Sequence, residues 1–194
     1  MSMSTFYRLS AVAGLLSSLA IITDNLLPEG DSFNWVGVLS PVFGLLALTG
    51  LYLWQRETSG KLGALGYIAN LLGMGFFVGL AFANAFMLPY LSGSVLKELF
   101  AGPTRWAFVV GGSIFLIGVI LFGLAALKAR TYPRPAAALY MVGFIPVSLQ
   151  PLFPVMVITL GGLMAGIGIA WFSYALWSGT KAVETTRVIP ASAA

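Results

Sequence analysis

Long apolar stretches alternate with short polar ones along the whole chain. A helix needs about 20 predominantly apolar residues to cross a bilayer, and most of the stretches reach that length. The connections between them are short and rich in proline, glycine and charged residues. We therefore predict an all-α, polytopic transmembrane bundle of six helices. The predicted crossings are Leu9–Leu27, Trp35–Trp54, Leu62–Tyr90, Trp106–Leu127, Ala136 to about Phe153, and Val155–Trp177.

The fifth stretch is the weakest of the six. Ala136 to Gln150 spans only about 22 Å at 1.5 Å per residue, and Pro146, Pro151 and Pro154 interrupt it. The alternative is a re-entrant segment that does not cross the membrane. The last helix would then run toward the outside instead of toward the cytosol. We predict six crossings with a tight outer hairpin at the sequence QPLFP, and a kink at Pro146, where proline removes a backbone hydrogen bond.

Small residues recur at four-residue spacing on the predicted helices. Gly75 and Gly79 do so on the third helix, and Gly162 and Gly166 on the sixth. Such ridges let two helix backbones approach closely. With six helices available in one chain, we predict that they pack against each other inside the bundle, with a partner protein as the alternative.

The composition places the chain in a membrane. Of the 194 residues, 59% are hydrophobic and 8% are charged, which leaves too little polar surface for a water-soluble globule of this size. We predict one transmembrane domain over residues 1–178 and a flexible cytoplasmic tail over 179–194, where the sequence becomes polar and small. The net charge of +4 belongs to the connections, so it does not indicate a nucleic-acid partner.

Basic residues lie mostly in alternate connections, as in proteins whose short cytoplasmic connections collect lysine and arginine. If both termini are cytoplasmic, only Lys97 and Arg105 lie outside. We therefore predict a multi-pass plasma-membrane protein with both termini in the cytosol. The predicted cytoplasmic basic residues are Arg8, Arg56, Lys61, Lys128, Arg130, Arg134, Lys181 and Arg187.

Cysteine and histidine are both absent. Their absence removes thiolate nucleophiles, imidazole bases and the commonest ligands for zinc, copper and haem. Paired buried carboxylates, which intramembrane enzymes and ion-coupled pumps use, cannot be assembled either. We therefore expect no enzyme, no cofactor and no metal.

The stretch TDNLLPEGDSFN, residues 23–34, holds three of the six acidic residues, Asp24, Glu29 and Asp31. Their oxygens suit a hard cation such as calcium, but the spacing lacks the glycine and the final glutamate of an EF-hand loop. PEGD and Asn34 are typical of a polar turn between two helices. We predict an external loop, with Asp24 alone as an unusual residue.

Asp24 and Arg105 each have the wrong charge for their helix end. Asp24 lies near the C-terminal end of the first predicted helix, and Arg105 lies at the N-terminal end of the fourth. The helix dipole disfavours both. Because both are predicted at the outer interface, an ion pair would relieve both penalties. The alternative is that each side chain reaches water separately.

Few polar residues are predicted within the bilayer. Asn70 and Asn84 lie fourteen residues apart on the third helix and share a face with Phe77 and Ala81. Gln150 lies at the proline-rich corner. Polar groups at this depth are candidates for a ligand-facing role, but amides also hold helices together at about 1 kcal/mol each. We favour the structural role.

The outer connection SGSVLKELFAG, residues 92–102, has apolar residues on one side and Lys97 and Glu98 on the other. This pattern predicts a short amphipathic helix. It would lie in the outer membrane interface or act as a lid over a cavity, and the pattern does not distinguish the two.

Two functional classes remain. The first is a non-catalytic accessory subunit of a membrane complex, or a homo-oligomer, or a binder of a lipophilic molecule. The second is a small transporter or its substrate-binding subunit. In length, in its six crossings and in the pairs Ala13 with Ser17 and Gly14 with Ser18, the chain resembles the substrate-binding components of energy-coupling-factor vitamin importers. The resemblance implies a similar topology and places none of that family's ligand-binding residues.

The segment GLYLWQRETSGKLGALGY, residues 50–67, is similar to the segment that joins two helices in many small, uncharacterised six-helix membrane proteins of bacteria. That resemblance implies a prokaryotic origin and no particular activity.

Overall fold

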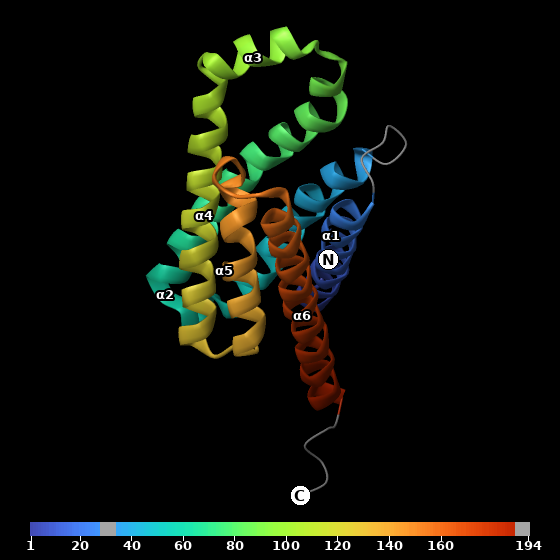
Figure 1. Cartoon of the computed structure of the whole chain (residues 1–194). Coiled ribbons are helices and arrows are strands. Elements are labelled where there is room, and N and C mark those ends of the chain that lie inside the picture. Colours follow the sequence, from blue (N-terminus) through green and yellow to red (C-terminus); the bar gives the residue numbers. More distant parts are fainter. Residues whose placement is uncertain (28–33, 189–194) are drawn as a thin grey trace, which may run out of the picture.

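The computed structural model describes residues 1–27 and 34–188, and this part of the chain is all-α (Figure 1). Two short 3-10 turns, Leu88–Tyr90 and Gln150–Leu152, lie next to the helices. The helices are α1 (Met3–Leu26), α2 (Asn34–Phe86), α3 (Gly93–Ala101), α4 (Thr104–Ala129), α5 (Arg134–Ser148) and α6 (Val155–Val188).

The long helix α2 is two arms that meet at Gly60. Gly60 has φ 56° and ψ −149°, a combination that is essentially confined to glycine. The arms, residues 34–59 and 61–86, correspond to the predicted second and third crossings. With α1, α4, α5 and α6 they make six long segments, which confirms the predicted helical bundle.

Successive long segments run in opposite directions. At one end of the bundle, the ring of Tyr7 lies 5.1 Å from that of Trp54, and the guanidinium of Arg8 lies 5.7 Å from the ring of Trp177. The Gly60 turn and the connection between α4 and α5 lie at the same end, where Thr58 and Thr131 are hydrogen bonded at 3.2 Å. The N-terminus, both of these turns and the end of α6 therefore share one end.

In the described part of the chain, four helices are long and apolar enough to cross a membrane, namely α1, α2 with the turn after it, α4 and α6. Because α2 folds back at Gly60, it supplies two of the crossings. Helix α5 has only 15 residues. The 3-10 turn Gln150–Leu152 follows it and leads into α6 as the predicted tight hairpin. The protein is therefore a membrane-embedded helix bundle.

Glycines let the helices meet backbone to backbone. A Cβ added at Gly118 of α4 would lie 2.1 Å from the backbone nitrogen of Asn70, and one at Gly66 would lie 2.5 Å from that of Phe122. Gly143 of α5 meets α6 in the same way, 2.4 Å from the backbone nitrogen of Ala165. The contact between α4 and the second arm of α2 thus depends on glycines that the four-residue spacing did not single out.

The two predicted glycine ridges behave differently. Gly162 and Gly166 lie against α1, and the hydroxyl of Ser18 donates to the carbonyl of Gly166 at 2.7 Å. Gly75 and Gly79 are exposed, and a Cβ at either would meet no described atom within 4 Å. The prediction that this second ridge packs inside the bundle is wrong, because α4 covers the neighbouring face of the same arm, at Gly66 and Gly73.

The last helix runs past Trp177, where we predicted its end, to Val188. The first part of the predicted tail, from Gly179, is therefore helical. The predicted amphipathic helix is present as α3, with no buried residue, and it packs against the beginning of α4 through Phe100 and Phe108, whose rings lie 5.3 Å apart. The predicted loop at 28–33, with Glu29 and Asp31, lies outside the described residues.

Candidate functional site: a cavity inside the helix bundle

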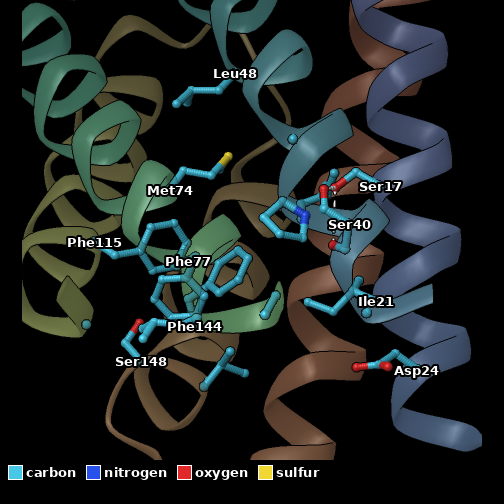
Figure 2. Close-up of a pocket in the computed structure, with 18 of the residues that line it drawn as sticks. Ser17, Ile21, Asp24, Ser40, Leu48, Met74, Phe77, Phe115, Phe144 and Ser148 are labelled. Carbon is cyan, nitrogen blue, oxygen red and sulfur yellow. Dashed lines mark hydrogen bonds between the residues drawn. The ribbon is translucent and has the colours of Figure 1, made fainter. Parts of the chain in front are cut away.

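A cavity of about 450 Å³ lies between the helices. Residues of α1, both arms of α2, α4, α5, the turn after α5, and α6 line it (Figure 2). Its size falls within the usual range for small-molecule sites. Every long segment of the bundle contributes to its wall.

The floor of the cavity is aromatic and buried. Phe122 is 1% exposed, Phe172 0% and Tyr140 5%, and Tyr140 makes edge contacts with the rings of both phenylalanines. Nearby, Tyr132 of the connection between α4 and α5 donates to the carbonyl of Leu51 at 2.9 Å. The floor is therefore closed, and it lies toward the end of the bundle that holds the N-terminus and the end of α6.

A second group of rings forms one wall. Phe77 and Phe115 have ring centroids 4.5 Å apart, and Phe115 meets Phe144 edge to face at 5.0 Å. Figure 2 shows the three rings side by side, with Met74 next to them. They come from the second arm of α2, from α4 and from α5, so this wall depends on the close contact that Gly73 and Gly118 permit.

The opposite wall joins α1 to the first arm of α2. The hydroxyl of Ser17 donates to the carbonyl of Ser40 at 2.8 Å, and both serines line the cavity (Figure 2). Pro41 follows inside the helix and has no N–H, so the carbonyl of Gly37 lacks its usual partner one turn along. The wall thus carries backbone acceptors as well as apolar surface.

The mouth of the cavity lies where α1 ends and α2 begins. Asp24 lines it, and a Cβ at Gly37 would lie 2.7 Å from a carboxylate oxygen of Asp24. In Figure 2 the Asp24 side chain projects from α1 toward the cavity. The first turn of α2, with its positive dipole end, therefore stands beside the carboxylate.

The structure does not bring Asp24 and Arg105 together. Among the described residues Asp24 has no ion-pair partner, and Arg105 is exposed at the start of α4. Helix α1 packs against α2 and α6, whereas α4 packs against α2 and α5, so the two helix ends lie apart (Figure 1). The carboxylate of Asp24 lies instead beside the beginning of α2, whose positive dipole end favours a negative charge. The predicted penalty for Asp24 takes account only of the dipole of α1 itself and not of that of the next helix.

The predicted intramembrane polar residues fall in two places. Asn84 and Gln150 line the cavity near its mouth and are exposed there. Asn70 is fully buried and donates from its amide to the hydroxyl of Tyr140, which supports the interhelical role. Phe77 and Ala81, predicted to share the face of Asn84, line the cavity with it.

Ser148 is a cavity residue that the sequence did not single out. It is 8% exposed, and its hydroxyl has no hydrogen-bond partner among the described residues. It lies across the cavity from Asp24 (Figure 2). Its place before a proline-rich corner is the only sequence signal that could have pointed to it.

In the part of the chain that the structure describes, histidine, cysteine, aspartate and glutamate residues form no group of three or more that could hold a metal ion. Comparison of the chain with models of known protein families, with curated proteins and with solved structures gave no match. The cavity and its lining residues therefore carry the functional argument.

Proposed function

We propose that this membrane protein is a non-catalytic binder of a lipophilic small molecule, which it holds in the cavity inside the bundle. The observation that carries the proposal is the lining of the cavity, with a closed aromatic floor and a polar mouth. Apolar walls with a few polar groups at one end are typical of small-molecule sites. A molecule seated there would bury its apolar part at the floor and keep a polar group at the mouth.

We further propose that the protein lies in the plasma membrane with both termini in the cytosol. The excess of lysine and arginine in the predicted cytoplasmic connections supports this orientation. In this orientation the mouth, which lies at the end opposite the termini, faces the outside of the cell. The ligand would enter from the outer leaflet or from the medium.

Two other roles remain as alternatives. The outward face of Gly75 and Gly79, with Leu72 and Phe76 beside it, favours an accessory subunit or a homo-oligomer, because exposed small residues admit a partner helix. The one-sided opening of the cavity and the topological resemblance to importer components favour a small transporter, which would need a second state open at the floor.

The test is co-purification. The protein is extracted in mild detergent, and the material released by denaturation is compared with that from the variant Ala81→Trp. Ala81 lines the cavity and is half-buried, so an indole there would fill the space. We expect a small molecule in about one copy per chain from the wild type and its loss from the variant.

The matched control is Ala138→Trp, the same substitution at an exposed position of α5 that does not line the cavity. It should retain the bound molecule. Equal yields of the molecule from all three proteins, or none from the wild type, would contradict the binding role. A protein that co-purifies in constant ratio would support the accessory role instead.

A further inference from the structure

The mouth of the cavity has one charged side chain. Of the described residues that line the cavity, only Asp24 is charged. The basic residues Lys97 of α3 and Arg105 of α4 lie at the same end, but both are exposed and neither lines the cavity. The first turn of α2 offsets the carboxylate only in part, since a helix end is equivalent to about half an elementary charge. The described residues that line the mouth therefore carry a net negative charge.

The other polar groups near Asp24 add acceptors. The amide nitrogen of Asn25 donates to the carbonyl of Ile21 at 2.8 Å, which leaves its oxygen to accept. The carbonyl of Gly37 lacks its helical partner because of Pro41. Ser148, across the cavity, has a buried hydroxyl with no partner among the described residues. A ligand group that donates several hydrogen bonds would satisfy the carboxylate, the amide oxygen and the carbonyl together, and the Ser148 hydroxyl can accept from it as well.

The rings below the mouth favour the same sign of charge. Phe77, Phe115 and Phe144 form a continuous aromatic wall, and aromatic faces attract cations as well as apolar groups. A carboxylate or phosphate would meet the negative faces of the rings and the charge of Asp24 without a compensating basic group.

We propose that the cavity binds amphipathic cations, with an ammonium group at Asp24 and an aromatic or alkyl body against the phenylalanine wall. This inference rests on the proposed function, because it names the chemical class of ligand for the same cavity. It assigns Asp24 as the residue that selects the charge of the ligand. The apolar wall supplies affinity that is shared by charged and uncharged ligands of the same shape.

The test uses three probes with one aromatic body: naphthylmethylamine, naphthylmethanol and naphthoic acid. Binding to the full chain in lipid nanodiscs is measured by equilibrium dialysis against empty nanodiscs. The wild type should bind the amine about tenfold more tightly than the alcohol, as expected for a charge-assisted contact, and the acid most weakly. Asp24→Asn should reduce the affinity for the amine to that for the alcohol and leave the alcohol unchanged.

The matched control is Glu98→Gln, which removes the same charge from an exposed position of α3 outside the cavity and should keep the preference for the amine. Unchanged binding of the alcohol shows that a variant is folded. If the alcohol binds but the amine shows no advantage, or keeps it in Asp24→Asn, the charge selection is overturned while the cavity role stands. If none of the three probes binds to the wild type, both proposals are overturned.

Discussion

At the scale of the residue, a few polar groups buried among apolar ones decide which contacts hold the bundle. Asn70 is 0% exposed, and its amide donates to Tyr140, a residue of the cavity floor. Because there is no water at this depth to replace a lost partner, each group depends on the other. Asn70 therefore links the second arm of α2 to α5 and fixes the ring that closes the cavity.

We expect Tyr140→Phe and Asn70→Leu to be coupled. Each single change leaves one buried polar group without its partner, whereas the double change removes both. The coupling energy should be about 1 kcal/mol, as for other hydrogen bonds between membrane helices. Thermal unfolding of the four proteins in detergent measures it, and additive single effects would show that the hydrogen bond contributes nothing.

Asp24 illustrates what residue-level reasoning from sequence can and cannot do. Its position at the end of α1 marked it as unusual, and the structure places it at the mouth of the cavity. The group beside it could not be derived, because the dipole of α1 shows that a carboxylate is disfavoured at this helix end but does not show which other element lies next to it. For Ser148 the sequence offers only its place before the proline-rich corner, because a buried hydroxyl without a partner is visible only once the helices are packed.

At the scale of the element, glycines determine which helices touch. The hydrophobic pattern predicted five of the six crossings within a few residues, and the proline-rich corner after α5 became the expected hairpin. The pattern of small residues was a weaker guide. It identified Gly162 and Gly166 correctly, but Gly118 and Gly73, which approach the backbone of the facing helix more closely, lie outside the four-residue ridges.

We expect Gly118→Ala and Gly75→Ala to have opposite effects on stability. A methyl group at Gly118 would clash with the backbone of Asn70, which cannot move away as a flexible side chain would, so the loss should be about 1–3 kcal/mol. At Gly75 a methyl group meets no described atom within 4 Å, and the better helix propensity of alanine should add up to about 1 kcal/mol.

Thermal unfolding in one detergent checks both substitutions. Equal losses at the two positions would show that the face of Gly75 is also packed, and the assignment of that face to the outside of the bundle would then be abandoned. A gain at Gly118 would contradict the close contact of α4 with α2.

At the scale of the whole molecule, the fold is a bundle whose six long segments surround one space. That much follows from the apolar pattern together with the turn at Gly60. The cavity does not follow from it, because the same six crossings would make a solid bundle if larger side chains stood at Gly44 or Ala47, both of which line the space. The cavity exists because several small side chains face one another, and only the packed structure shows which side chains do so.

The bundle has the N-terminus and the end of α6 at one end and the mouth of its cavity at the other. Since the chain has no cysteine, two single-cysteine variants test this arrangement directly. Gln150→Cys places a thiol at the mouth, and Glu57→Cys places one beside the Gly60 turn; both positions are exposed. A membrane-impermeant maleimide is applied to intact cells that express each variant, and to the same cells after permeabilisation.

We predict that Gln150→Cys is labelled in intact cells and that Glu57→Cys is labelled only after the membrane is opened. Labelling of both positions in intact cells, or of Glu57→Cys alone, would contradict the threading of the chain and the placement of the cavity mouth.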